Sequence, residues 1–272
     1  MSDKNRAFSP RVQTVIEEFV PIIKTMAEGR YAISVGGSHG KGTWDSRSDI
    51  DFRLFADKWF WQDVKPELWK DFYERMARWG EQGVLIDGVW VRLINDTDAA
   101  INRWVEGEGK PDDLVWTIWG YHLLPDIYHQ SIIEDPYGVI AGWKQRLSVY
   151  PPKLKKVTLE KHLASVKYWR GDYHYANKVQ RGDYVFLAGL SSRLVHDLNQ
   201  ILFALNEVYY VGDGSNLHFM EDFKVMPAGF AARVKEILYP PQEEDMFVKQ
   251  RERLVSLIDE VVLLAEEAEK AN

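Results

Sequence analysis

The 272-residue sequence contains no cysteine, which excludes disulfides, thiolate metal sites and a cysteine nucleophile and fits a reducing compartment. It also lacks an apolar run of the roughly 20 residues that a membrane-spanning helix needs, and residues 1–10 are too polar for a secretory signal. We therefore expect a cytoplasmic protein without a membrane partner. Positive charge is in deficit, because 34 Lys and Arg against 41 Asp and Glu give a net charge of −7. This balance disfavours binding to a nucleic-acid backbone.

What the sequence does contain is typical of a folded chain, with 46% hydrophobic residues and 11 tryptophans. Ser9 and Pro10 form a suitable helix start, and apolar residues recur at helical spacing after them. Helical patterns dominate beyond residues 151–152, where a double proline interrupts regular structure. We predict an α+β protein, with a mixed-sheet domain over residues 1–150 and an all-α helical bundle over residues 151–272.

Two further predictions concern elements of the first domain. The aromatic-rich residues 58–79 predict one helix. Residues 84–86 and 89–94 are β-prone runs separated by Asp87 and Gly88. An Asp-Gly linker between such runs is a strong signal for a hairpin, so Asp87 is expected in a turn.

The most informative feature is a strand–loop–strand pattern near the N-terminus. The apolar residues 31–35 predict a strand, the small residues 36–38 break it, and after a polar loop a second strand opens with Asp49 and Asp51. Because side chains alternate along a strand, these two carboxylates share one face while their apolar neighbours face the core. Paired carboxylates repel each other unless a cation lies between them. Mg²⁺, which prefers one or two carboxylates plus substrate phosphates, is the expected occupant.

The loop between the two strands has the residue types that hold a phosphate. Gly37 allows close approach of the backbone, and loop amides with the Ser38 hydroxyl can donate hydrogen bonds to phosphate oxygens. Lys41 and Arg47 could add positive charge, and Ser48 completes the set of candidate nucleotide-binding residues. Loop and carboxylates together suit phosphoryl or nucleotidyl transfer, in which catalysis is mainly positioning and charge stabilisation.

These residues resemble a known signature. The Gly37-Ser38 pair, the loop to Ser48 and the Asp49-Ile50-Asp51 triplet are similar to the motif of the DNA polymerase β-type nucleotidyltransferase superfamily. Within it, the chain resembles the bacterial two-domain branch that includes aminoglycoside adenylyltransferases of the kanamycin type. Three further stretches resemble recurrent segments of such two-domain members: residues 133–138, 181–184 and 205–210.

The resemblance implies an activity and its partners. A nucleoside monophosphate, AMP in the first instance, would pass from a nucleoside triphosphate to a hydroxyl of a small molecule, with aminoglycosides as one class of acceptor. Asp49 and Asp51 would be the catalytic carboxylates and ligands of Mg²⁺. Two alternatives remain open: a nucleotide-binding or regulatory protein without transfer activity, and transfer of the nucleotide to a protein.

One departure from the family pattern concerns the third carboxylate, which the family places on a neighbouring strand. The expected counterpart is residues 89–94, where Arg92 is central and no Asp or Glu occurs. Asp87 could reach the site, two carboxylates could suffice, or Arg92 could pair with Asp49 or Asp51 in a protein without catalysis.

The remaining charged and polar residues are interpreted without a catalytic role. Arg53 lies on the face of the two aspartates and balances their charge. In the helical half, Arg193, His196 and Asn199 lie off the apolar stripe of a long helix, which favours an ordinary polar surface. Asp183 is expected to cap that helix.

Overall fold

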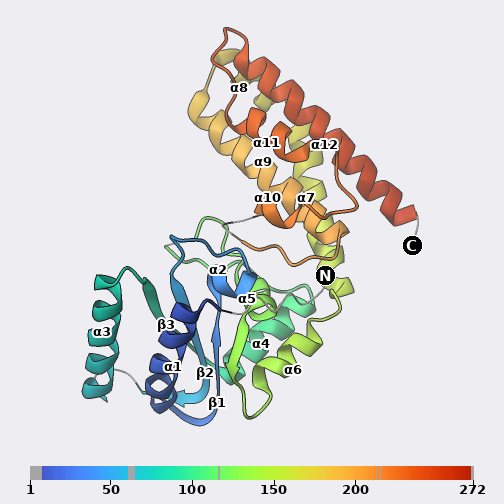
Figure 1. Ribbon diagram of the computed structural model, residues 1–272. Helices are drawn as coiled ribbons and strands as arrows, with labels where there is room; N and C mark the ends of the chain where they lie inside the picture. Colours follow the sequence, from blue (N-terminus) through green and yellow to red (C-terminus); the bar gives the residue numbers. More distant parts are fainter. Residues whose placement is uncertain (1–7, 61–64, 116, 213, 215, 271–272) are drawn as a thin grey trace. The chain divides into compact units, whose positions relative to one another are not determined.

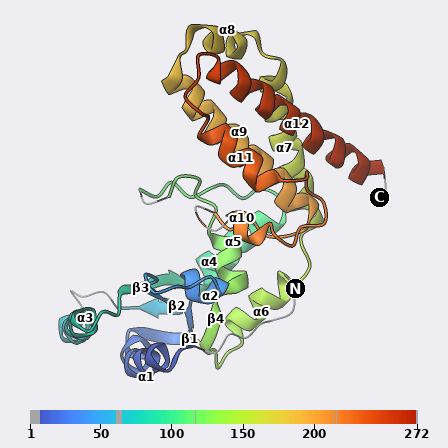
Figure 2. The ribbon, with the colours of Figure 1, turned by 45° about the horizontal axis from the view of Figure 1, so that its top comes forward.

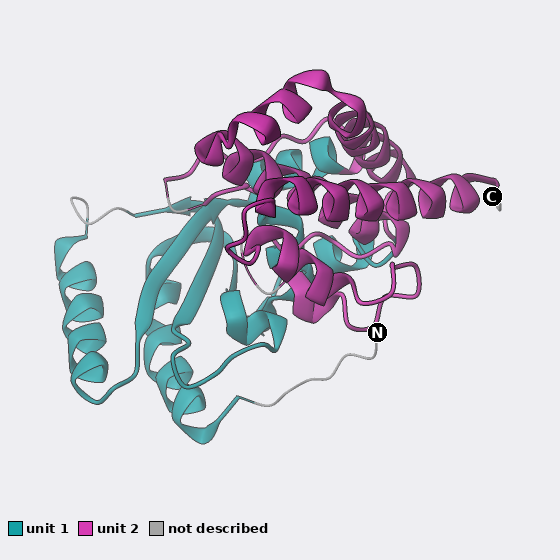
Figure 3. Ribbon diagram, turned by 90° about the horizontal axis from the view of Figure 1, so that it is seen from above, with its two compact units in different colours: residues 1–104, 122–149 teal, residues 105–121, 150–272 magenta. Residues whose placement is uncertain are grey.

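The computed structural model describes residues 8–60, 65–115, 117–212, 214 and 216–270. The chain forms two compact units, Met1–Trp104 with His122–Val149, and Val105–Tyr121 with Tyr150–Asn272 (Figure 3). The chain's last crossing between the units, from Val149 to Tyr150, lies beside the boundary expected at residues 150 and 151. Residues 105–121, which we expected in the first domain, are grouped with the second unit. The chain is an α+β protein with a mixed sheet followed by a helical region.

The first unit is built on a mixed sheet. Its strands are β1 (Ala27–Val35), β2 (Ile50–Trp59), β3 (Ile86–Leu93) and β4 (Ser131–Glu134). They lie in the order β3-β2-β1-β4, with β2 and β3 parallel and the other neighbours antiparallel. The helices are α1 (Pro10–Thr25), α2 (Gly37–Lys41), α3 (Pro66–Glu81), α4 (Ile94–Val105), α5 (Leu123–His129) and α6 (Val139–Arg146).

Strand β2 shows why the sheet is covered on both faces (Figures 1 and 2). The side chains of Phe52 and Leu54 are fully buried in a core that α1 and α3 complete. The alternate residues point the other way: Phe55 meets Trp143 of α6 edge-on at 5.1 Å. Arg53, on that same second face, pairs with α5. The strand therefore has one apolar face and one face on which charged and apolar side chains mix, as alternation predicts.

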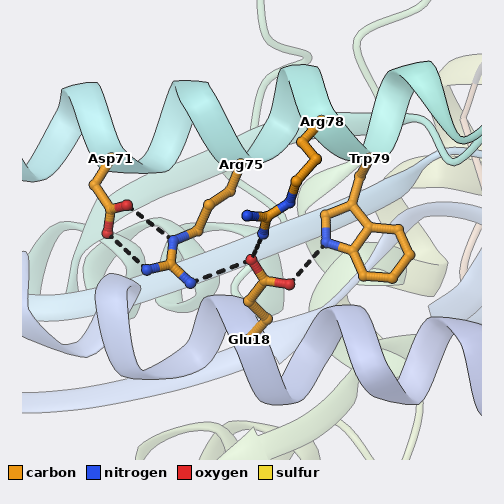
Figure 4. A network of polar contacts seen from close by, with 5 residues as sticks. All are labelled: Glu18, Asp71, Arg75, Arg78 and Trp79. Atoms are coloured by element: carbon orange, nitrogen blue, oxygen red, sulfur yellow. Dashed lines mark hydrogen bonds and ion pairs between the residues drawn. The ribbon is translucent and has the colours of Figure 1, made fainter.

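Helices α1 and α3 are joined by a polar network as well as by the core (Figure 4). Glu18 of α1 accepts hydrogen bonds from Arg75, Arg78 and Trp79 of α3, and Arg75 also pairs with Asp71. The N-terminus of α1 begins as predicted, because the Ser9 side chain accepts from the Val12 amide and Pro10 takes the first helical position.

Two predictions in this unit are wrong. The helix expected over residues 58–79 is shorter, because β2 continues through Trp59 and α3 begins only at Pro66; residues 61–64 lie outside the described residues. The hairpin at Asp87 and Gly88 does not form either. Both residues belong to the single strand β3, which pairs in parallel with β2 instead of folding back on itself.

The second unit has its own helical core. It contains α7 (Pro152–Gly171), α8 (Tyr173–Arg181), α9 (Tyr184–Leu205), α10 (Asn216–Phe219), α11 (Phe230–Leu238) and α12 (Met246–Lys270). Helix α9 packs against α7, α8, α11 and α12, so its apolar stripe lies at the centre. Asp183 caps α9 as predicted, accepting a hydrogen bond from the Phe186 amide. Among the described residues, no helix combines the length and hydropathy that crossing a membrane requires.

Candidate metal centre

Three carboxylates gather where β2 and β3 begin. Asp49 immediately precedes β2, Asp51 is its second residue, and Asp87 is the second residue of β3. Within the described part of the chain, one oxygen from each lies within 4.8 Å of the others. Asp49 and Asp51 are half-buried, whereas Asp87 is exposed. The sequence predicted the first two as neighbours and left the contribution of Asp87 open.

A bulge in β3 brings the third carboxylate to the group. Ile50 pairs with Ile86, but Asp51 pairs with Gly88, so that Asp87 is the extra residue. Gly88 has a φ of +114°, which a residue with a side chain rarely adopts. Bulges redirect side chains at strand ends and beside active sites. The Asp-Gly pair therefore forms a bulge within a strand, although its composition had suggested a turn.

The pKa of Asp51 is raised by its surroundings. Its side chain is 16% exposed. Burial raises the pKa of Asp51 to about 6; Arg53 opposes the shift, and the negative charges of Asp49 and Asp87 add to it. A bound divalent cation would offset both the burial and the repulsion. Three carboxylate oxygens within coordinating reach of one another therefore fit a hard, oxygen-binding cation such as Mg²⁺.

Arg53 lies beside this group but is held mainly by another residue. Its Nε and Nη2 atoms donate to the two carboxylate oxygens of Asp126, at 2.9 and 3.3 Å. Its Nη1 atom is 3.6 Å from Asp51 Oδ1. Burial opposes ionisation of Asp126, but the charge and hydrogen bonds of Arg53 outweigh it and lower the pKa of Asp126. The sequence assigned Arg53 to charge balance and gave no sign of Asp126.

The backbone turn after β1 fits tightly against the carboxylates. The Gly36 amide donates to the Asp51 carbonyl at 2.9 Å. Gly37 has a φ of +56°, and a Cβ atom there would lie 1.7 Å from Asp51 Oδ2. Only glycine satisfies both conditions at this position. The turn that was predicted to hold phosphate is therefore placed directly beside the predicted metal ligands.

Two of the predicted phosphate-binding side chains lie at this turn, in α2. The hydroxyl of Ser38 is buried and has no hydrogen-bond partner among the described residues, so it retains an unused donor. Burial lowers the pKa of Lys41, against the opposing charges of Asp126 and Asp51, which places its amine within the electrostatic field of the site. Both groups are suited to a phosphate that reaches the carboxylates.

Ser48 and Arg47 have local roles in the rest of the loop. The Ser48 hydroxyl accepts a hydrogen bond from the Asp45 amide at 2.9 Å and donates to the Asp45 carboxylate at 3.2 Å. The Arg47 amide donates to the same carboxylate. These bonds close a turn of the Asx type. Ser48 thus stabilises the loop, and its predicted nucleotide contact stays a prediction.

Arg92 lies farther along β3, where the sequence had suggested the third carboxylate should be. Its Nη2 atom is 3.1 Å from His122 Nε2, and its guanidinium lies over the Trp90 ring at 5.2 Å. In the strand register Arg92 pairs with Phe55, four residues beyond Asp51. The arginine that pairs with Asp51 is Arg53.

The helical unit contains a buried polar cluster that sequence reasoning missed. Asp197 Oδ1 is 2.6 Å from His162 Nδ1, and Asp197 Oδ2 accepts from the Ser165 hydroxyl at 2.6 Å. The His196 ring stacks on Trp119 at 4.1 Å, and burial lowers its pKa to about 3. This histidine is therefore neutral at pH 7.

The prediction of an ordinary polar surface on the long helix is wrong for two of its three residues. Arg193 is exposed, but His196 and Asn199 are each only 7% exposed. Both residues do lie off the apolar stripe of α9, as predicted. Because α9 is in contact with α7, α8, α11 and α12, positions away from the stripe are also buried.

A comparison with known protein families finds a match to part of the chain. The model of a domain family of unknown function, DUF4037, matches residues 116–213, which is less than half of the chain and lies mostly in the helical unit. The match includes the His162–Asp197 cluster and excludes the three carboxylates. No curated protein matches the sequence.

Proposed function

We propose that the protein is a metal-dependent nucleotidyltransferase that moves a nucleoside monophosphate, AMP in the first instance, from a nucleoside triphosphate to a hydroxyl of a small molecule. The observation that carries the proposal is the group of Asp49, Asp51 and Asp87 beside the glycine turn. Three carboxylates around one point suit a divalent cation, and an unused buried hydroxyl with a lysine suits the phosphates.

The chain's own residues have separate tasks in this reaction. The three carboxylates hold Mg²⁺, which when bound stabilises negative charge on the phosphate oxygens. Ser38 and Lys41 orient the triphosphate through a hydrogen bond and a positive charge. The acceptor oxygen then bonds to the α-phosphorus, the bond from that phosphorus to the bridging oxygen breaks, and pyrophosphate leaves with the electron pair. The proton of the acceptor hydroxyl is released as the new phosphate ester forms.

The place of Asp87 also bears on the rival interpretation. A nucleotide-binding protein without transfer activity was suggested because Arg92 occupied the expected position of the third carboxylate. In the structure a carboxylate from β3 does join the other two. This supports the enzyme, because a third carboxylate is present although residues 89–94 contain none. An acidic chain with a net charge of −7 suits a cationic acceptor, and aminoglycosides are such molecules.

The experiment measures binding before turnover. Wild type, Asp49→Asn/Asp51→Asn and Asp87→Asn are titrated with each nucleoside triphosphate in the presence of Mg²⁺, by calorimetry. We expect the wild type to bind and both variants to bind weakly. Asp57→Asn is the matched control, because Asp57 is a β2 carboxylate paired with Arg30 at the surface. Equal binding by wild type and the double variant would refute the metal centre.

Turnover is then tested with a panel of aminoglycosides and other polyhydroxylated amines. The readouts are pyrophosphate release and transfer of label from an α-³²P nucleotide to the acceptor. We expect both signals to depend on acceptor, on Mg²⁺ and on the three carboxylates. Transfer of label to a protein instead of a small molecule would redirect the acceptor assignment while leaving the reaction class intact.

A further inference from the structure

The metal centre has a competitor built into its own strand. Arg53 is two residues beyond Asp51 on β2, on the same face, and its side chain is only 12% exposed. An arginine stays protonated at any pH at which the protein folds. A permanent cation beside three carboxylates can neutralise them and so compete with a divalent cation for the same oxygens.

Arg53 is only slightly too far from Asp51 to form a hydrogen bond with it. Arg53 Nη1 lies 3.6 Å from Asp51 Oδ1, whereas a charge-assisted hydrogen bond has a length of about 2.8 Å. A small rotation of the guanidinium would close that gap. Something must therefore hold the side chain back if Asp51 is to bind metal.

Asp126 on α5 supplies the opposing attachment. It engages Arg53 through both carboxylate oxygens, in the two-bond geometry that fixes the plane of a guanidinium. The Trp90 ring lies 5.6 Å from the Arg53 guanidinium carbon and adds a second contact. Asp126 also touches the glycine turn, since a Cβ atom on Gly36 would lie 2.7 Å from Asp126 Oδ1.

We propose that Asp126 is a positioning residue, which keeps Arg53 from closing its 3.6 Å ion pair with Asp51 into a direct hydrogen bond and so keeps the three-carboxylate group available to a divalent cation. The inference rests on the proposed metal centre and deepens it. Asp126 binds no metal in this account. Its effect passes entirely through Arg53, and that dependence makes the proposal testable by a second substitution.

The experiment measures Mn²⁺ binding to the full chain without nucleotide, by the loss of the electron paramagnetic resonance signal of free Mn²⁺. We expect Asp126→Asn to weaken Mn²⁺ binding about 10- to 100-fold, as is usual when a residue outside the metal ligands is lost. In Asp126→Asn/Arg53→Met the competitor is gone, and we expect affinity to return to near the wild-type value. Asp126→Glu keeps the charge and the pairing, and should bind as wild type does.

Asp57→Asn is the matched control for the loss of an Arg–Asp pair in the same sheet. Asp57 holds Arg30 through two side-chain bonds, as Asp126 holds Arg53, but at the surface. We expect no change in its Mn²⁺ affinity. Circular dichroism melts establish that each variant is folded, and if Asp126→Asn is not, the Asp126→Glu and double variants decide.

The outcomes separate this inference from the proposed function. Wild type that binds no Mn²⁺ would refute the metal centre, and the role of Asp126 with it. Wild type and Asp126→Asn that bind equally well would overturn the role of Asp126 alone. Equal weakness of Asp126→Asn and the double variant would also overturn it, because Asp126 would then act through the glycine turn and not through Arg53.

Discussion

Replacement of Gly37 by alanine should both strain the backbone and damage the proposed metal centre, and a control glycine allows the two effects to be separated. The new Cβ atom would lie 1.7 Å from Asp51 Oδ2 and 2.6 Å from its Cγ atom, and the backbone φ is +56°. The substitution therefore carries two costs. One is the left-handed backbone conformation, and the other is the collision with a carboxylate that we assign to the metal.

The two costs differ in size and in where they appear. The left-handed conformation costs a residue with a side chain about 1–2 kcal/mol of stability. Relief of the collision requires the Asp51 carboxylate to move by about 2 Å, to reach an ordinary van der Waals contact. A displacement of about 1 Å at a reacting centre can cost 10²-fold in rate. We therefore expect a modest loss of stability and a far larger loss of Mn²⁺ binding and turnover.

Gly138→Ala is the matched control in the same unit. Gly138 has a φ of +67°, and a Cβ atom there would meet nothing within 4 Å. It shares the backbone cost with Gly37 and lacks the collision. Urea denaturation followed by tryptophan fluorescence measures stability, and Mn²⁺ titration measures the site. If both variants lose the same stability and keep the same Mn²⁺ affinity, the close packing of the turn against Asp51 has no functional role.

Three further predictions address pH, the helical unit and the contact between α1 and α3. The native pKa of Asp51, about 6 against an ordinary 3.8, means that its ionised form disfavours the native state above pH 6 and that this penalty fades as pH falls toward 4. Asp51→Asn should therefore stabilise the metal-free protein by about 3 kcal/mol at pH 7 in urea titrations, with little gain at pH 4, while metal affinity of the wild type falls below pH 6. Asp197→Asn should cost the helical unit roughly 1–3 kcal/mol, because the buried His162 and Ser165 side chains lose their carboxylate partner. Hydrogen exchange of α7 and α9 measures this, and Ser165→Ala should cost only about 1 kcal/mol. Glu18→Gln should cost about 1 kcal/mol in thermal melts, whereas Glu74→Gln, in an exposed pair of α3, should cost nothing measurable.

Local patterns were sufficient for the elements whose cause is local. The helix start at Ser9 and Pro10 and the cap at Asp183 depend on hydrogen bonds within three residues, which the sequence displays directly. The shared face of Asp49 and Asp51 follows from strand alternation alone. These predictions needed no knowledge of the remaining chain.

The features that failed depend on distant partners. Asp87 and Gly88 have the same composition in a hairpin turn as in a bulge, and only the parallel pairing of β3 with β2 decides between them. Asp126 is 73 residues from Arg53, and nothing near it in the sequence marks it as the partner. A single sequence gives no means of finding such pairs, so the contribution of Asp87 stayed open and Asp126 was missed.

The balance of charge around Asp51 links these observations to one conclusion about the site. Four carboxylates, those of Asp49, Asp51, Asp87 and Asp126, act there together with the cations of Arg53 and Lys41. Four negative and two positive charges leave two negative charges in excess, which one divalent cation would balance. Without the metal, protonation of Asp51 can relieve part of this excess, because burial raises the pKa of Asp51 and the neighbouring carboxylates add to the shift. Arg53 offsets part of the charge of Asp51, but it donates two hydrogen bonds to Asp126, which in our proposal leaves the three carboxylates available to a metal. On the proposed function, this arrangement would favour a divalent cation over a proton and over the protein's own arginine.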